Sequence, residues 1–312
     1  MNEENQTTVT FFILKGISEV PELQTPVFIL ILFLYLTILG GNMTVLVLIC
    51  MDPHLHNPMY FFLGNLSVMD MISVTVTLHK VLGNFISGDK TISISACMTQ
   101  MYLYSSITDA EMLMLTAMSY DRYVAICNPL LYPVIMSNIA CILLAFFSWL
   151  LGFIESLIFL LFLLNVSCYR SNIMDHFYCD PMPLMELSCS GTSTLERVAF
   201  IEGIPVILTP FSLTFTSYIY IISTILRIRS STGKRKTFYT CSSHLTVFTL
   251  LYITIVFVYL TPTSSDRMVF KKISALCNTM AIPLLNPLIY SLKNKDMKSA
   301  FKRLLRCFNV AI

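Results

Sequence analysis

The sequence predicts an all-α membrane protein: a bundle of seven transmembrane helices, followed by a short amphipathic helix. Of the 312 residues, 55% are hydrophobic and only 12% are charged, whereas a soluble protein would carry about 25% charged residues. Seven apolar stretches are each long enough to cross a bilayer, which takes about 20 helical residues. No soluble domain or repeat interrupts them, and the charge balance does not indicate a nucleic-acid partner.

The spans divide the chain into an extracellular segment over residues 1–25, a membrane domain over 26–292, and a cytoplasmic helix and tail over 293–312. The first segment is polar and is expected to be only partly ordered. It lacks the features of a cleaved signal peptide, so the first span is expected to act as a signal anchor. The predicted spans are Pro26–Cys50, Met59–Leu82, Ala96–Tyr120, Ile139–Leu164, Val198–Leu226, Phe238–Leu260 and Ile273–Leu292.

Basic residues set the orientation. They gather in the connection before the sixth span and after the seventh. Two crossings separate these regions, so they lie on the same side of the membrane, whereas seven crossings put the two termini on opposite sides. Cytoplasmic loops are rich in Lys and Arg, so the C-terminus is predicted to be cytoplasmic and the N-terminus extracellular. Asn5, in the pattern Asn-Gln-Thr, is then a candidate glycosylation site. The basic residues are Arg227, Arg229, Lys234, Arg235, Lys236, Lys293, Lys295, Lys298, Lys302, Arg303 and Arg306.

The third span ends in a charged pair. By helical rise, Arg122 lies roughly 37 Å from Cys97, so Asp121 and Arg122 are expected at one membrane face and Cys97 at the other. Charged residues in a span are expensive and are candidates for function. The simpler alternative is that Arg122 has no function beyond extending its side chain to the membrane–water interface.

Two acids, Asp70 and Glu111, are expected at similar depth in the membrane. They indicate either a buried cation site, with Asn286 as a third oxygen ligand and sodium as the ion, or two neutral hydrogen-bonded acids. No other cofactor is indicated.

Four cysteines are expected on the extracellular side, an even number in an oxidising compartment. Of their three possible pairings we favour Cys97–Cys179, which would pin the loop over the third helix, and then Cys168–Cys189. Cys50, Cys127, Cys141, Cys241 and Cys307 are expected near the cytoplasmic face and reduced. Cys307 is either a palmitoylation site or an idle thiol. It lies in the segment 293–308, whose basic and apolar residues alternate as in a helix on anionic lipid.

Short motifs, in order along nearly the whole chain, resemble those of rhodopsin-like G-protein-coupled receptors and, more narrowly, of vertebrate odorant receptors. The first resemblance rests on Asp-Arg-Tyr at 121–123 and Asn-Pro-x-x-Tyr at 286–290. The second adds Pro58–Leu63, Met118–Cys127, Ser188-Cys189, Ser217-Tyr218, Thr240–Leu245 and Pro283–Lys295. His79, Ser119 and Asp109 depart from the usual pattern.

The resemblance implies how the chain signals. Arg122 would rest against Asp121 and then engage a G protein of the stimulatory olfactory type, which raises cyclic AMP. His244 would link to Arg122 in the inactive form, and Asp70 and Glu111 match the buried cation site of the family. The other implied switch residues are Tyr123, Tyr218, Tyr252, Asn286, Pro287 and Tyr290.

The ligand is expected in the outer half of the bundle, in a small, mostly apolar cavity that suits an organic odorant. Asp109 and Glu202 are unusual there. If one of them points inward and is ionised, an amine would be favoured; otherwise any small organic molecule fits. The candidate residues are Met101, Tyr104, Ser105, Thr108, Asp109, Met112, Glu202, Ile255, Tyr259 and Thr279.

Other functions fit less well. No nucleophile–base pair or zinc-ligand pair indicates an enzyme. A transporter would predict inverted repeats and broken helices in matching halves, which the sequence does not show. A rhodopsin-like receptor for a non-odorant ligand stays an alternative.

Overall fold

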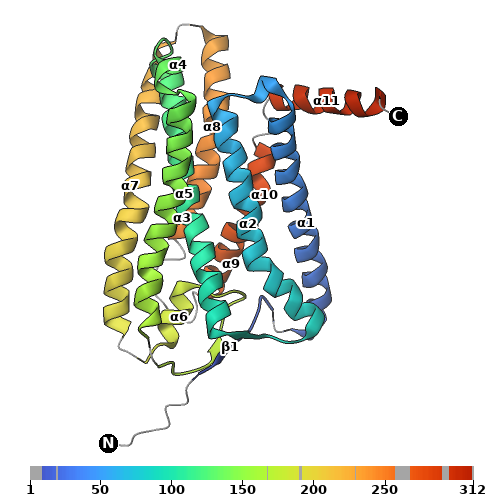
Figure 1. Ribbon diagram of the computed structural model, residues 1–312, viewed down its shortest axis with the longest axis vertical. Helices are drawn as coiled ribbons and strands as arrows, with labels where there is room; N and C mark the ends of the chain where they lie inside the picture. The colour runs from blue at the N-terminus through green and yellow to red at the C-terminus, as the bar shows by residue number, and fades with distance from the viewer. Residues whose placement is uncertain are drawn as a thin grey trace, which may run out of the picture.

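The computed structural model describes residues 9–18, 20–166, 168–189, 192–228, 230–256, 268–289 and 295–310. Long helices stand side by side in one bundle (Figure 1), which confirms the predicted fold class. Six are continuous within the described chain: α1 (Pro21–Met51), α2 (Pro58–Ser87), α3 (Ile94–Cys127), α5 (Asn138–Leu164), α7 (Thr192–Arg227) and α8 (Ser231–Ile255). The seventh place is filled by three pieces in succession: α9 (Met268–Leu276), the π-helical η4 (Cys277–Ala281) and α10 (Ile282–Pro287).

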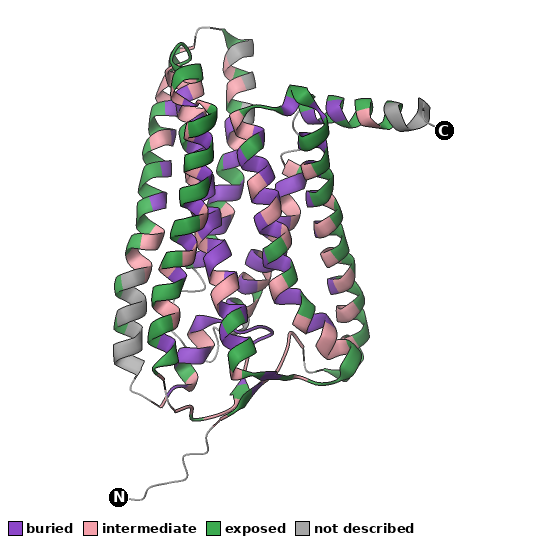
Figure 2. Ribbon diagram, in the orientation of Figure 1, coloured by how far each residue is buried: buried purple, intermediate pink, exposed green. Residues whose placement is uncertain are grey.

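The bundle is built around α3, which packs against α2, α5, α7 and α8. Burial is concentrated on these inner faces, whereas α1, α5 and α7 turn exposed faces outward (Figure 2). The outward faces carry large apolar side chains such as Phe33, Leu161 and Phe215, which hydrocarbon solvates better than water does. Four described helices are long and apolar enough to cross a membrane: Pro21–Met51, Pro58–Ser87, Asn138–Leu164 and Gly203–Arg227.

Polar residues at the helix starts fix where three of these helices begin. The side chains of Asn57, Ser93 and Ser137 accept hydrogen bonds from backbone N–H groups in the first turns of α2, α3 and α5. Such caps satisfy donors that have no partner inside the helix.

Gly152 lets α5 approach α3 closely. A Cβ atom at this position would lie 2.6 Å from the backbone oxygen of Ser106 and 2.7 Å from the backbone nitrogen of Ala110. Small residues at helix crossings are a general feature of membrane bundles, because packing replaces the hydrophobic effect there. The contact between α3 and α5 thus depends on the absence of a side chain at one residue.

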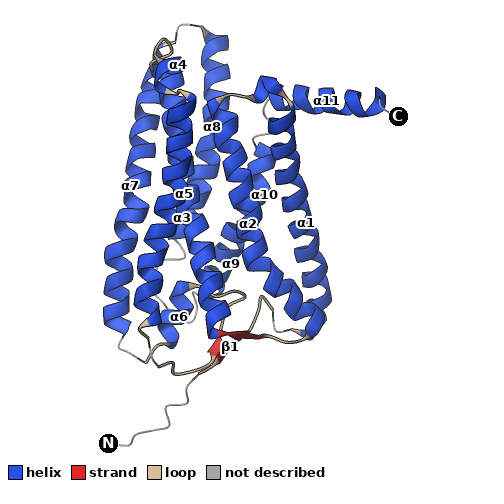
Figure 3. Cartoon of the chain, viewed as in Figure 1, coloured by secondary structure: helices blue, strands red, loops and turns tan. Residues whose placement is uncertain are grey.

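Within residues 1–25 the structure describes 9–18 and 20–25, and part of this segment belongs to a sheet. Phe11–Leu14 form strand β1, which pairs antiparallel with β2 (Thr91–Ser93) and parallel with β3 (Ile173–Met174) (Figure 3). Phe12 and Leu14 are fully buried, because they pack in one cluster with Cys97 and Cys179. The buried residues 12 and 14 alternate with more exposed neighbours, and this alternation is typical of a strand. In addition, α1 starts at Pro21, five residues before the predicted span.

Both predicted disulfides are confirmed. Cys97–Cys179 joins α3 to the segment before α6 (Pro181–Leu187), and Cys168–Cys189 closes a smaller loop, with Cα–Cα distances of 5.4 and 5.3 Å. We call this the disulfide end of the bundle. Cys277, which the expected division of the cysteines left out, is a free thiol in η4.

At the opposite end, which we call the Arg122 end, short elements connect the long helices. They are η1 (Pro53–Leu55), after α1, and α4 (Tyr132–Ile135), after α3. The last helix, α11 (Lys295–Val310), runs across this end at a steep angle to the bundle (Figure 1). It buries Met297 and Ala300 and exposes Phe301 and Leu305, as expected for a helix that lies on a membrane surface.

Candidate functional site

An ion pair between a half-buried arginine and a buried carboxylate lies at the Arg122 end. The Arg122 guanidinium donates from Nε to the Asp121 carboxylate at 2.9 Å and makes a second hydrogen bond through Nη2. The other carboxylate oxygen accepts from the Tyr132 hydroxyl at 2.8 Å. Asp121 is fully buried. Because water does not reach its carboxylate, the Arg122 charge and the hydrogen bond from Tyr132 stabilise it instead.

Tyr132 is a member of this site that the sequence reasoning missed. It lies in α4, outside the spans, and reaches back to α3. Burial, and then the nearby Asp121 carboxylate, raise the pKa of Tyr132, so the phenol stays neutral and donates. Tyr132 follows Arg122 by ten residues and lies in a connecting segment. Its contact with Asp121 could not be predicted from sequence spacing, because the geometry of the connection decides the direction of the side chain.

His244 contacts Tyr218. The Tyr218 hydroxyl and His244 Nδ1 are 2.7 Å apart and the two rings stack. The other ring nitrogen of His244 is buried without a hydrogen-bond partner in the part of the chain that the structure describes. The Arg122 charge acts on the His244 ring, but no hydrogen bond between the two side chains is found among the described residues. The implied link to Arg122 stays a prediction, and the observed contact joins α8 to α7.

The remaining predicted switch residues are partly described. Tyr123 is half-buried, with its ring 5.9 Å from that of Tyr220. Tyr252 is buried against Phe248, with ring centroids 4.4 Å apart. Tyr290 lies outside the described residues.

Midway along the bundle, Asn286 and Asp70 form a polar contact. Nδ2 of Asn286 donates to both carboxylate oxygens of Asp70, at 3.0 and 2.9 Å. The amide thus presents its nitrogen to Asp70, whereas the sequence predicted an oxygen ligand there. The Asn286 side-chain oxygen and one Glu111 carboxylate oxygen are buried, with no partner among the described residues. These orphaned acceptors are of the kind that a hard cation or ordered waters would satisfy.

A second polar contact gives the buried Asn42 of α1 a partner in the seventh helix. Asn42 donates to the backbone oxygen of Pro283 at 3.1 Å, an acceptor near the prolines of the seventh helix. Gly41 lies beside the ring of Pro287, which a Cβ atom would approach to 3.2 Å. Neighbouring helices commonly satisfy the backbone groups that proline frees in a membrane, and α1 does so here.

The predicted ligand residues are only partly brought together. Met112 and Ile255 pack in one buried cluster, whereas Met101 lies in the cluster of the Cys97–Cys179 disulfide. Thr108 and Thr279 are buried, and their hydroxyls donate to backbone oxygens of their own helices. Ser105 is half-buried. Tyr259 and the side chain of Glu202 lie outside what the structure describes.

Asp109 faces α5 and not the predicted ligand residues. The Ser156 hydroxyl donates to its carboxylate at 2.8 Å. Helical spacing alone could not separate these faces, because residues 108 and 109 differ by about 100° around α3. The placement of Asp109 at the ligand site is therefore corrected.

The loop that carries Cys179 covers the candidate ligand site from the disulfide end. Tyr178 is buried, and its ring packs against that of Tyr104 at 5.0 Å. Its hydroxyl donates to Asp180 at 2.9 Å. Gln100 of α3 accepts from the backbone nitrogen of Cys179 and donates to the backbone oxygen of Val76. The sequence reasoning missed these residues, although buried polar groups beside a disulfide were a usable signal.

An ion pair fastens α11 to the loop after α1. Arg303 donates to Asp52 Oδ2 from Nε at 2.8 Å, and His54 contacts the other carboxylate oxygen at 2.9 Å. Burial raises the pKa of Asp52, but the hydrogen bonds from Arg303 and His54 outweigh it and bring the pKa down to about 2. Asp52 therefore carries its charge at any physiological pH.

We expect Arg303→Gln to loosen α11 and to lower the thermal unfolding midpoint of the purified protein by a few degrees at pH 7. The pKa of Asp52 is lower in the folded protein than its ordinary value of 3.8. The ion pair therefore stabilises the fold above about pH 4 and loses this effect as the pH falls toward 2. The difference between native and variant protein should shrink over that range. Arg306→Gln, at an exposed position of α11, is the control; an equal drop in both variants would contradict the role of Asp52.

Comparison with known proteins agrees with this geometry. The family model described as olfactory receptor matches residues 31–307. The chain is 44% identical to human olfactory receptor 6C1, over 97% of each chain. It is also 44% identical to mouse olfactory receptor 8A1, over 98% of this chain and 99% of that one, and 43% identical to human olfactory receptor 1L4. The chain therefore belongs to the olfactory receptor family, whose members are G-protein-coupled receptors and not enzymes.

Proposed function

We propose that this chain binds a small organic odorant in the half of the bundle nearer the disulfide end. It then activates a stimulatory, olfactory-type G protein at the Arg122 end, which raises cyclic AMP. The observation that carries the proposal is the Arg122–Asp121 ion pair at the end of α3. In the resting receptor the carboxylate binds the guanidinium that would later contact the G protein. Arginine is well suited to such a role, because it stays charged and can exchange one set of acceptors for another.

The two ends also support an orientation for this multi-pass membrane protein. Disulfides persist in oxidising compartments, so the disulfide end faces outward, with the N-terminus and a glycan on Asn5. Arg227, Lys234 and the basic residues of α11 lie toward the Arg122 end, which the positive-inside rule assigns to the cytoplasm. There α11 rests on the anionic inner leaflet of the plasma membrane.

In the proposed mechanism the described contacts are those of the resting receptor. Ligand binding shifts the balance toward a state in which α8 moves outward and Arg122 leaves Asp121. The Tyr218–His244 contact joins α7 to α8 and would have to rearrange in that step. Tyr252, buried against Phe248 and Phe211, would transmit the change from the ligand to α8. Pro287 would do so from the seventh helix, together with Tyr290, which lies outside the described residues.

The middle of the bundle is proposed to hold a sodium ion in the resting state. Asp70 and Glu111 would supply the charge, and the Asn286 oxygen could join them if the amide turned over. Bound sodium would stabilise the resting state, if that is the state in which these oxygen atoms lie closest together.

We propose a neutral ligand. The Asp109 carboxylate accepts a hydrogen bond from Ser156 on α5, so it would not contact a ligand beside the other candidate residues. Tyr104 and Thr108 of α3, with Ile255 of α8, then supply an apolar surface with few polar groups. A cationic ligand would need Glu202 or another acid.

We expect Asp109→Asn to leave the odorant concentration for half-maximal response unchanged within about threefold. The amide can still accept from Ser156, so the contact with α5 survives. The measurement is cyclic AMP in cells that express equal surface amounts of each receptor. Loss of a response to amines alone would instead show that the Asp109 carboxylate contacts the ligand.

The proposed function is tested by screening chemically diverse odorants, amines included, against cells that report cyclic AMP. An active compound should then stimulate nucleotide exchange on the purified G protein by the purified receptor. Activity in cells without exchange by the purified pair would overturn the proposal. So would flux of the compound into liposomes that contain the receptor alone, which is the behaviour of a transporter.

A further inference from the structure

Two neighbouring lysines of the seventh helix hold the loop that covers the candidate ligand site. Lys272 Nζ lies 2.6 Å from Asp175 Oδ1, and Lys271 Nζ lies 3.9 Å from Glu186 Oε1. Both acids belong to the segment Cys168–Cys189, which a disulfide closes into a loop; we call it the covering loop. Two ion pairs therefore connect the covering loop to α9, the piece of the seventh helix at the disulfide end.

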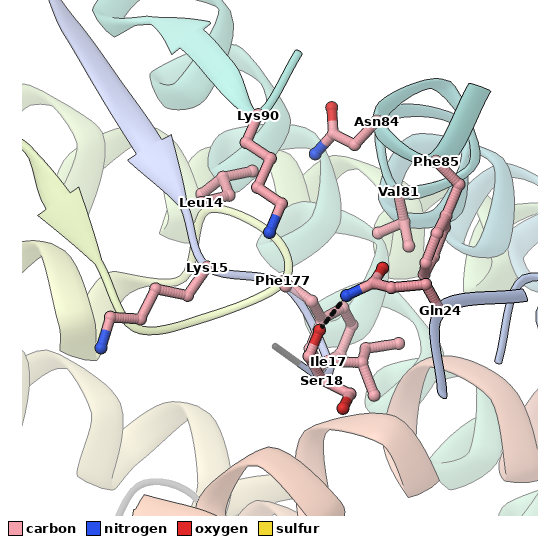
Figure 4. A pocket seen from close by; sticks show the side chains of 11 residues that line it. Leu14, Lys15, Ile17, Ser18, Gln24, Val81, Asn84, Phe85, Lys90 and Phe177 are labelled. Atoms are coloured by element: carbon pink, nitrogen blue, oxygen red, sulfur yellow. Dashed lines mark hydrogen bonds between the residues drawn. The ribbon is translucent and has the colours of Figure 1, made fainter. Parts of the chain in front are cut away.

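The covering loop is held more firmly on its other sides. The Cys97–Cys179 disulfide joins it to α3. Strand β3 of the loop pairs with β1, and Phe177 packs in one cluster with Ile17, which follows β1 (Figure 4). Ion pairs between partly exposed side chains, such as Lys272–Asp175, contribute much less than a covalent bond, because water solvates the separated charges well. The side of the loop that faces α9 is therefore the side that opens most readily.

The inner face of α9 leads from the ion pairs to the candidate ligand residues. Lys271 is buried, and Ala275, one turn further on, packs in one buried cluster with Tyr104 of α3. Thr279, about one more turn along, is a candidate ligand residue and is fully buried. Phe270 is instead exposed on the outer face. A molecule that passes between the covering loop and the inner face of α9 would therefore reach the candidate ligand site directly.

The segment that follows α9 is suited to act as a hinge. Cys277–Ala281 form the π-helical η4, and helices bend where a π-helical turn interrupts their regular hydrogen bonds. The hinge itself is fixed to α8, because the Thr254 hydroxyl donates to the Asn278 side chain at 3.2 Å. Beyond it, α10 is fixed to α2 by the bonds from Asn286 to Asp70. The outer piece, α9, can therefore swing while α10 stays in place.

We propose that odorants enter and leave between the covering loop and α9, with η4 as the hinge of this entrance and the ion pairs of Lys272 and Lys271 as its latch. The inference deepens the proposed function and rests on it. The two lysines are positioning residues, which act through the covering loop and do not contact the odorant. Weakening the latch opens the entrance more often, so entry and exit both become faster by a similar factor and the affinity for the odorant stays nearly the same.

The test needs no odorant. The full-length receptor in lipid nanodiscs carries Thr279→Cys in a Cys277→Ser background, and the probe is methyl methanethiosulfonate, a small uncharged thiol reagent. Mass spectrometry follows its reaction at position 279, which the reagent reaches only when the bundle opens, because Thr279 is fully buried. Reaction at Cys50, an exposed thiol of α1, is the internal reference.

Lys272→Gln should raise the rate of reaction at position 279 about two- to fivefold, the effect expected when a partly exposed ion pair is lost. Asp175→Asn should raise it by the same factor. The double variant should be no faster than either single variant, because both changes remove one interaction. Lys80→Gln is the matched control: Lys80 also lies toward the disulfide end, donates to the backbone oxygen of Asp89 at 3.4 Å, and should leave the rate unchanged when replaced.

An unchanged rate in Lys272→Gln would overturn the entrance. So would an equal rise in Lys80→Gln, which would indicate only a general effect of positive charge. Increases that multiply in the double variant would show that Lys272 and Asp175 act separately, and would overturn the latch. Because neither odorant nor G protein is present, a failure of the proposed function would leave these rates as they are.

Discussion

Replacing Arg122 with alanine should abolish odorant-driven nucleotide exchange on the G protein, to below about 5% of the native rate by the size of effect expected for a charged group at the centre of an interface. Arg122 is the cation that the proposed mechanism releases, and alanine offers nothing in its place. Exchange measured with purified receptor and G protein, at matched receptor amounts, checks the result. Normal exchange by this variant would contradict the assigned role.

Two further variants separate signalling from folding. Among the described residues, Arg122→Ala leaves the buried Asp121 carboxylate with only the Tyr132 hydroxyl as a hydrogen-bond partner, and an uncompensated buried charge is destabilising. Asp121→Asn instead frees the arginine and keeps a hydrogen-bonding side chain, so ligand-independent exchange should rise. Arg227→Ala removes an exposed arginine from the end of α7 and controls for the loss of positive charge at this face.

Gly152→Ala should destabilise the folded bundle by ~1–3 kcal/mol, the cost of overpacking a well-packed contact. The added methyl group would meet the backbone of Ser106 and Ala110 at 2.6–2.7 Å. Backbone atoms cannot turn aside as a flexible side chain can, so α5 must move away from α3. Thermal unfolding of the purified receptor measures the effect.

Gly40→Ala is the matched control for Gly152→Ala. Apart from the neighbouring backbone of α1 itself, no atom of the described residues lies within 4 Å of the position that a Cβ at Gly40 would take, and alanine is the better helix former. This variant should be neutral or slightly stabilising. A similar loss in both variants would show that glycine in these helices matters for a reason other than the approach of α5 to α3.

The sequence predicts the spans well because lipid leaves few alternatives. A backbone that crosses hydrocarbon must satisfy its own hydrogen bonds, so a long apolar run is sufficient evidence for a helix. The pairing of four cysteines was likewise limited to three possibilities, and Cys97 at the start of a central helix favoured one of them. Both disulfides are present.

Side-chain direction could not be predicted in the same way. The spacing of α3 placed Asp109 close to the ligand face, but the hydroxyl of Ser156 on another helix decides where it points. Tyr132 and Tyr178 lie in connecting segments, where no periodicity fixes the direction of a side chain. Strand β1 was missed for a related reason: four residues become a strand only when partners from two distant loops are available.

The position of β1 between two later segments has a consequence for how the chain is assembled. One edge of β1 stays unpaired until residues 173 and 174 have been synthesised, because these residues form the strand β3 with which it pairs. By that point the first four long helices have emerged. The closure of the disulfide end is thus a late event in biosynthesis. A deletion that reaches Phe12 should therefore leave this end of the bundle open.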